Sequence, residues 1–276
     1  MGINENNSFA ISEGNNAGTE GRTSPADALT AVMDIGELLL RHGAETSRVE
    51  DTISRLGRRY GFERVDVFSI TSSIVVSAFT GQGEVFTQTR RIRERDTDLG
   101  IVSRANALSR LASAEDISPE QLRKMAADIR QTRTVHLRRD FCMYLLISAS
   151  LSMFFGGTFR DAAAAMLSGA VLYASVLFCS GFKMNPLLMN AFASVLAGAA
   201  AVLTVVLGIG EHPDRIMIGN IMLVIPGIQL TTSLRDMISG ETISGLLNLI
   251  EALLKAFFVA AGFAIVMEAA VRIGGM

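Results

Sequence analysis

The chain divides into two stretches that space their hydrophobic residues differently. From residue 25 to residue 139, short apolar groups alternate with charged ones, whereas long apolar runs dominate residues 140–276. A composition shift of this kind marks a boundary between a soluble part and a membrane part. We therefore expect a soluble domain over 25–139 and a transmembrane domain over 140–276.

Within the first stretch, the hydrophobic period changes from helical to extended and back. Ser24-Pro25 is a good helix start, and apolar residues then recur at three- and four-residue steps through two helices that end near Gly61. The segments RVDVFSI, SIVVSAF and EVFTQTRRI are β-branched and aromatic, which predicts a three-stranded antiparallel meander. Two more helices, at about 99–114 and 118–133, complete a predicted α+β domain.

The second stretch contains five apolar segments of the length that a membrane helix needs, roughly 17–25 residues. They cover residues 141–159, 162–180, 187–209, about 216–233 and about 245–270. Small residues are frequent in them, and such residues let membrane helices approach closely. The predicted fold is therefore an α-helical polytopic membrane protein with five transmembrane helices, preceded by a soluble α+β domain.

Charge outside the spans indicates the orientation of the chain. The arginines immediately before the first apolar run are Arg130, Arg133, Arg138 and Arg139. Positive charge beside a first span marks its cytoplasmic side. We expect a multi-pass protein of the cell membrane, surrounded by lipid bilayer, with its amino-terminal domain in the cytoplasm. Residues 1–24 are rich in Asn, Gly, Glu and Ser and are predicted to be a disordered tail.

Composition excludes several classes of function. A net charge of −2 argues against binding to nucleic acid, which needs a basic field. His42, His136 and His212 have no metal-ligand spacing, and no phosphate-binding Gly-x4-Gly-Lys-Ser/Thr motif occurs, so we expect no metal and no cofactor. The arginines at 90–95 lie at a strand end beside acidic residues, and we expect them to form a solvated edge.

The fourth predicted span is interrupted at its centre. Residues 221–241 read IMLVIPGIQLTTSLRDMISGE, and Pro226 removes a backbone hydrogen bond there. A broken backbone at membrane depth is tolerated where it faces protein or a water-filled cavity, and transporters bind substrate or ions at such breaks. The alternative is an ordinary kink whose hydroxyls bond back to their own turn. The residues expected to line a site here are Asn220, Pro226, Gly227, Thr231 and Thr232.

The fifth predicted span carries a polar stripe, formed by Asn248, Glu251 and Lys255 at three- and four-residue steps. Ionisable groups inside a span are costly and usually face a pathway or a partner. The alternative is a mutual Glu251–Lys255 pair, with Lys255 reaching the membrane interface. Two adjacent spans with polar inner faces favour a conduit for a small molecule. The candidates for coupling to protons or to a substrate ammonium are Asp161, Asp236 and Glu251.

Four segments carry a resemblance to a known family. They are LLLRHGAETSRVEDTISRLGRRYG (38–61), VDVFSITSSIVVS (65–77), FFGGTFRDAAAAMLSGA (154–170) and VIPGIQLTTSLRDMISGETISGLLNLIEALLKA (224–256). Over about residues 28–270, the chain resembles the threonine/serine exporter (ThrE-type) family, and within it the larger subunit of the split, two-component form. Glu241 stands where the family often has Asp, which keeps the charge. The family motif in the first segment comprises Gly43, Ala44, Glu45, Arg48, Glu50 and Asp51.

The resemblance implies a function and a partner. It implies one subunit of a secondary-active exporter for threonine, serine or related small carboxylates, driven by the proton motive force. Split members are associated with succinate as well, so the substrate stays open. The resemblance also implies a separately encoded small membrane partner subunit, and it allows an oligomer.

Two hypotheses from other functional classes remain, an enzyme and a regulatory module. A membrane-anchored hydrolase would use the polar cluster His42, Glu45, Thr46, Arg48, Glu50 and Asp51. However, no Gly-x-Ser-x-Gly elbow occurs, and a charged turn between helices explains the cluster, so we expect no enzyme. A regulatory module that senses solute or gates the bundle is compatible with export.

Overall fold

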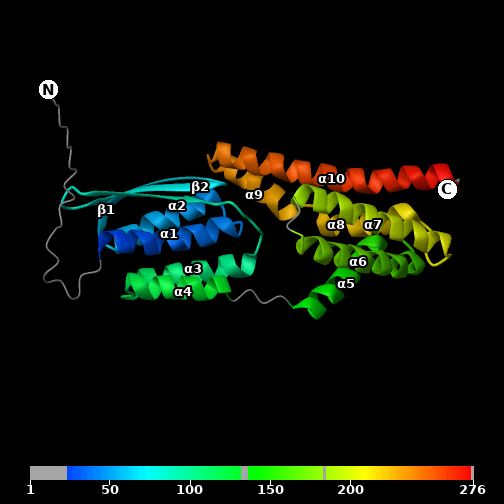
Figure 1. The fold of residues 1–276 in the computed structure, drawn as a ribbon, viewed down its shortest axis with the longest axis horizontal. Coiled ribbons are helices and arrows are strands. Elements are labelled where there is room, and N and C mark those ends of the chain that lie inside the picture. Colours follow the sequence, from blue (N-terminus) through cyan, green and yellow to red (C-terminus); the bar gives the residue numbers. More distant parts are fainter. Residues whose placement is uncertain (1–23, 132–135, 183–184, 275–276) are drawn as a thin grey trace, which may run out of the picture.

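The computed structural model describes residues 24–131, 136–182 and 185–274. An α/β unit lies at one end of a long molecule and a bundle of helices at the other, and one long helix, α10, runs beside both (Figure 1). The predicted tail, residues 1–24, lies outside the described residues except for Ser24.

The α/β unit contains the elements that the hydrophobic pattern predicts. They are α1 (Pro25–Arg41), α2 (Thr46–Arg59), β1 (Phe62–Ile70), β2 (Ser73–Thr80), β3 (Val85–Arg91), α3 (Leu99–Ala114) and α4 (Pro119–Gln131). The strands form an antiparallel sheet in the order β1-β2-β3, with Val67 opposite Val76 and Val76 opposite Gln88. The predicted meander and its four helices are confirmed.

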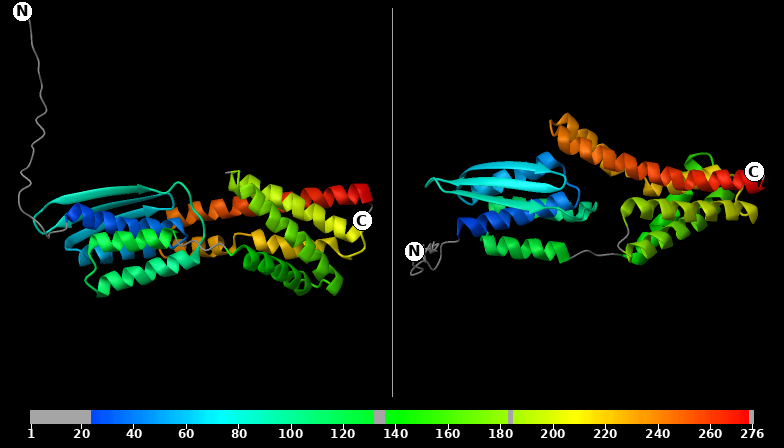
Figure 2. Two further views of the ribbon diagram at one scale, coloured as in Figure 1. Left: turned by 60° about the horizontal axis from the view of Figure 1, so that its bottom comes forward. Right: turned by 45° about the horizontal axis from the view of Figure 1, so that its top comes forward.

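Helix α1 is the middle layer of this unit, between the sheet on one side and α3 with α4 on the other (Figure 2). Its sequence is apolar around most of its circumference, as a helix covered on both sides requires. Leu29, Met33 and Ile35 are fully buried. Ser24 caps the helix by accepting a hydrogen bond from the Ala26 amide, so the predicted start is confirmed.

The bundle is built from α5 (Leu137–Phe154), α6 (Phe159–Ser180), α7 (Pro186–Val206), α8 (Pro213–Val224) and most of α10 (Thr242–Gly274). Its core mixes large apolar side chains with alanines, among them Ala164, Ala197 and Ala201. These residues let the helix axes come close, which is how helices associate in lipid.

Five full-length spans are not confirmed. Helices α6, α7 and α10 are long and apolar enough to cross a membrane, and α8 with α9 (Gly227–Ile238) forms a fourth span if the bent pair is counted as one. Helix α5 replaces the predicted span 141–159, but its first turn holds Arg138, Arg139 and Asp140. The apolar remainder measures only about 21 Å at 1.5 Å per residue, against a hydrocarbon core of about 30 Å.

The interruption at Pro226 is a true break between two helices. Ile225 and Pro226 both leave helical geometry, with ψ of 129° and 59°, and α8 and α9 meet at 53°. Helix α8 packs inside the bundle, whereas α9 packs chiefly on α10. The break therefore carries the chain out of the bundle toward the α/β unit (Figure 1).

Candidate functional site

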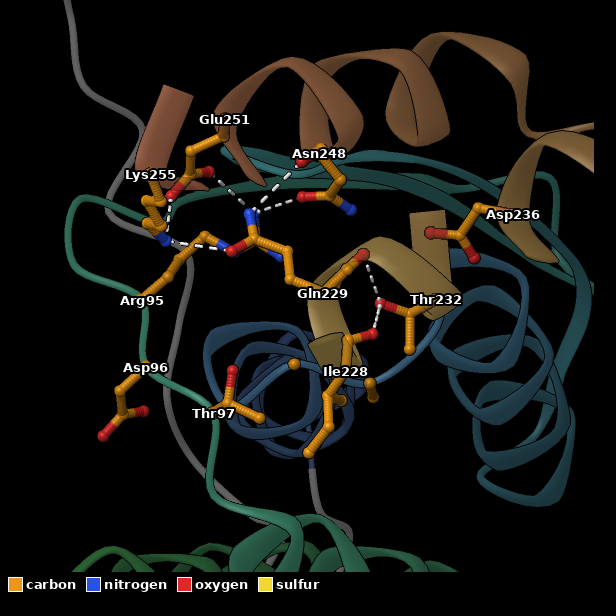
Figure 3. A pocket seen from close by; sticks show the side chains of 12 residues that line it. Arg95, Asp96, Thr97, Ile228, Gln229, Thr232, Asp236, Asn248, Glu251 and Lys255 are labelled. Atoms are coloured by element: carbon orange, nitrogen blue, oxygen red, sulfur yellow. Dashed lines mark hydrogen bonds and ion pairs between the residues drawn. The ribbon is translucent and has the colours of Figure 1, made fainter. Parts of the chain in front are cut away.

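A polar pocket of about 130 Å³ lies where the α/β unit meets α9 and α10 (Figure 3). The two helices contribute Ile228, Gln229, Thr232, Asp236, Asn248, Glu251 and Lys255 to its lining. The α/β unit contributes Gly43 and Ala44 from the turn between α1 and α2, and Arg95, Asp96 and Thr97 from the segment between β3 and α3. Residues predicted from separate motifs thus meet in one cavity.

The polar stripe of α10 forms one wall of this pocket. The Lys255 Nζ atom lies 2.7 Å from Glu251 Oε1 and donates to Gln229 Oε1 at 2.9 Å. Gln229 in turn donates to the backbone carbonyl of Asn248 at 3.3 Å. The sequence offered a mutual Glu251–Lys255 pair as the alternative to a pathway. This pair does form, and both of its members also line the cavity.

Arg95 enters the pocket from the α/β unit, which the sequence did not indicate. Its Nη1 donates to Asn248 Oδ1 at 2.8 Å and lies 4.0 Å from Glu251 Oε2. Its Nε is buried and has no hydrogen-bond partner among the described residues. Burial lowers the pKa of the Arg95 guanidinium, and the negative charges of Glu251 and Asp236 oppose that shift. The prediction of a solvated arginine edge is therefore wrong for Arg95.

Asp236 is the most buried carboxylate in the pocket, with 2% of its surface exposed. The backbone amide and the hydroxyl of Thr46, the first residue of α2, hydrogen-bond to it. Glu45 occupies the N-cap position of α2 but makes no side-chain cap bond, so Asp236 supplies a cap from another element. Its Oδ1 is buried without a hydrogen-bond partner in the described part of the chain. In Figure 3, Asp236 lies apart from the Arg95 cluster, beyond Thr232.

The amino-terminal motif divides between the interface and the body of α2. Glu45 accepts a hydrogen bond from Arg235 Nη1 at 2.5 Å, and Gly43 turns the chain with φ of +89°. The rest of the motif has partners within the α/β unit: Arg48 with Glu45, Asp51 with Arg55, and Glu50 with Ser69. The cluster weighed as a hydrolytic site is therefore spread over separate structural contacts.

Around the break, the threonine hydroxyls bond back to their own helix. Thr231 donates to the Gly227 carbonyl at 2.6 Å, and Thr232 donates to the Ile228 carbonyl at 3.0 Å. This is the behaviour expected of an ordinary kink. Thr232 also lines the pocket, whereas Thr231 is exposed.

Asn220 lies away from the pocket, in the core of the bundle. It is fully buried on α8, its Nδ2 donates to Ser168 of α6 at 2.5 Å, and its Oδ1 accepts from Ser148 of α5. These bonds tie three helices together, which is a structural role.

Asp161 lies at the end of the bundle away from the α/β unit, at the start of α6. Its buried carboxylate accepts from the amides of Thr158, Glu211 and His212, and it contacts His212 Nδ1 at 2.9 Å. Asp161, Glu211 and His212 are close enough to hold a metal ion. However, both Asp161 oxygens already have donors, so the group clamps the loop between α7 and α8.

The sequence is similar to proteins of one known family. A family model described as "Putative threonine/serine exporter" matches residues 30–270. Two similar proteins are named "Probable succinate transporter subunit YjjP". The one from Klebsiella aerogenes is 24% identical over 212 residues, 75% of this chain and 80% of its own. The one from Escherichia coli is 25% identical over 229 residues, 78% of this chain and 83% of its own.

A third relative differs in length. The "Threonine/serine exporter" of Corynebacterium glutamicum is 21% identical over 247 residues, which are 86% of this chain but 50% of that protein. No solved structure matches the chain. Because the family model covers nearly all of the α/β unit and the bundle, the chain belongs to the threonine/serine exporter family.

Proposed function

We propose that the chain is the larger subunit of a secondary-active exporter for threonine, serine or a related small carboxylate. The pocket between α9, α10 and the α/β unit is the place where the substrate loads. The observation that carries this proposal is the lining of the pocket, which brings the cations Arg95 and Lys255 together with the buried carboxylate of Asp236. A cavity with a few convergent polar groups of opposite charge suits a small zwitterion.

An amino acid has the complementary groups. Its carboxylate suits the cationic side of the pocket, where Arg95 and Lys255 lie, and its ammonium suits Asp236. Asp236 is also the candidate for proton coupling, because a buried carboxylate with a free oxygen can exchange a proton for a cationic group. Glu251 is less suited to this role, since Lys255 already neutralises it at 2.7 Å.

Orientation and assembly are part of the proposal. The arginines before α5 favour a cytoplasmic location for the α/β unit, so that the pocket would open to the cytoplasm where an exporter collects its substrate. Two of the similar proteins are named as subunits. We propose a small membrane partner that completes the translocation path beside α10.

A dicarboxylate such as succinate is the second candidate. The names of the two YjjP proteins favour it. The cavity also holds two cations, Arg95 and Lys255, although Lys255 already pairs with Glu251 at 2.7 Å. The unpaired oxygen of Asp236 opposes it, because a second carboxylate beside that oxygen would be repelled.

The test uses the chain expressed with its partner subunit in cells that lack their own exporters. Cells loaded with labelled L-threonine, L-serine or succinate are followed for efflux, with and without a protonophore. We expect amino-acid efflux that the protonophore abolishes, and its loss in Asp236→Asn at an unchanged membrane level. Asp214→Asn, an acidic residue in the first turn of α8, is the matched control. Failure of the wild-type pair to export any of the three compounds contradicts the proposal.

A further inference from the structure

We propose that Arg95 of the α/β unit binds the substrate carboxylate, and that the substrate displaces Asn248 of α10 from it. This inference rests on the proposed function and deepens it, because it makes the α/β unit part of the transport site. The unit would then be neither a tether nor a remote sensor.

The segment that carries Arg95 is held firmly on the α/β unit. The Ile92 amide donates to the Ser72 carbonyl at 2.8 Å, and the Ile92 side chain is buried in the core of the unit. The Asp96 amide donates to the Arg41 carbonyl at 3.1 Å. Arg95 stands between these two anchors, so its side chain crosses to α10 from a fixed base (Figure 3).

The present partners of Arg95 leave its binding capacity largely unused. A guanidinium has five N–H donors in a planar fork that matches two carboxylate oxygens. Asn248 Oδ1 is a neutral acceptor and takes one bond, at 2.8 Å. Glu251 lies 4.0 Å away and is tied to Lys255. A free carboxylate could bind the guanidinium of Arg95 through two charge-assisted bonds.

The exchange has a mechanical consequence. Arg95 and Asn248 form a direct contact between the α/β unit and α10, while the contact between Glu45 and Arg235 joins the unit to α9. A substrate that takes Arg95 from Asn248 releases the first contact and leaves the second. The Ser244 hydroxyl of α10 also donates to the Ser69 carbonyl of β1, at 3.4 Å, so loading of the substrate would loosen the hold of the unit on α10 without detaching it.

A purely structural role for Arg95 makes the opposite prediction for one variant. If the bond between Arg95 and Asn248 only joins the two parts, removing either side chain weakens transport. If Asn248 competes with the substrate, Asn248→Ala frees Arg95 and strengthens substrate binding. The variant leaves the Gln229 bond in place, because that bond uses the backbone carbonyl of residue 248.

The experiment measures proton-driven uptake into inverted membrane vesicles that contain the chain and its partner. The probe is whichever of L-threonine, L-serine and succinate the wild type transports, and the competitor is the same compound with one carboxylate converted to an amide. For Arg95→Gln we expect the half-saturating concentration to rise about tenfold or more, as for the loss of a charge-assisted bond. Discrimination between acid and amide should be lost as well. For Asn248→Ala we expect a lower half-saturating concentration.

Arg93→Gln, an exposed arginine on the same segment, is the matched control and should behave as the wild type. An unchanged half-saturating concentration and unchanged acid-over-amide preference in Arg95→Gln overturn the inference, and so does weaker binding in Asn248→Ala. Wild-type vesicles that transport none of the probes overturn the proposed function instead.

Discussion

Replacing Pro226 with alanine separates a structural kink from a functional break. Proline disfavours helical geometry in the residue before it and removes one backbone donor, and Ile225 and Pro226 are the residues that depart from the helix. Alanine imposes neither constraint, so a continuous helix through α8 and α9 becomes accessible. We expect export to fall while the protein remains in the membrane.

The geometry gives the size of the effect. Arg235 lies about 12 Å along α9 from Gly227 at 1.5 Å per residue, so removing the 53° bend would displace it by about 11 Å. Its contact with Glu45 could not survive that movement. Proline costs about 3 kcal/mol more than alanine inside a helix, which corresponds to about two powers of ten in an equilibrium constant. The contacts that hold α9 oppose straightening, namely its packing on α10, the Glu45–Arg235 pair and the cap between Asp236 and Thr46. Pro226→Ala therefore shifts the balance toward the straight form by up to about 3 kcal/mol, which weakens the docking of α9.

Two measurements follow this prediction. Efflux of the labelled substrate is compared at equal membrane levels, and cross-linking by a short bis-maleimide between cysteines introduced at Glu45 and Arg235, in a chain without Cys142 and Cys179, reports docking of α9. Pro226→Gly is the control, because glycine also disfavours the helix and should keep the break. Full efflux together with full cross-linking in Pro226→Ala would refute the reasoning.

Three further predictions concern stability, measured by thermal unfolding of the detergent-solubilised chain. Gly219→Ala would place a Cβ 2.6 Å from the backbone oxygen of Ser148, so we expect a loss of about 1–3 kcal/mol and a lower Tm, whereas Gly181→Ala should be neutral. Burial raises the pKa of Glu50 above its usual value, because the folded state favours the protonated carboxyl. The stabilising contribution of Glu50 is therefore present at acid pH and is lost as pH rises through the folded-state pKa. Glu50→Gln should be more stable than the wild type at pH 8, and the difference should be gone near pH 4. Asp161→Ala leaves several amides without an acceptor and should lower Tm by more than either change, while equal stability would contradict the clamp.

Much of the fold could be predicted because it depends on local patterns. The strand segments, the helix start at Ser24 and the helices α3, α6 and α7 follow from period, capping and length. The predicted first span, 141–159, does not match α5, because an apolar window ignores where a helix begins. Helix α5 starts at Leu137, inside the charged run, so its first turn is charged and the apolar part that remains is too short for a span.

The pocket could only be predicted in part. The break at Pro226 and the stripe on α10 are visible in the sequence as interrupted patterns. Their junction with the α/β unit is not, because Arg95 is 153 residues from Asn248 and Glu45 is 190 residues from Arg235. A single sequence contains no signal for such distances. Arg95 is also the same residue type as the arginines near it in the sequence. Only the path of its segment in the folded chain sets it apart from them.

The start of α2 is completed by a residue from another part of the chain, and this links two equilibria. Any ligand or proton that draws Asp236 away from Thr46 weakens the docking of α9 on the α/β unit, and docking weakens that ligand's binding by the same free energy, because such coupling is reciprocal. The amino-terminal unit then behaves as a tethered competitor of the substrate. The covalent chain sets the effective concentration of this unit at the pocket. A change in the cell therefore alters the competition only if it shifts the docking equilibrium between α9 and the α/β unit.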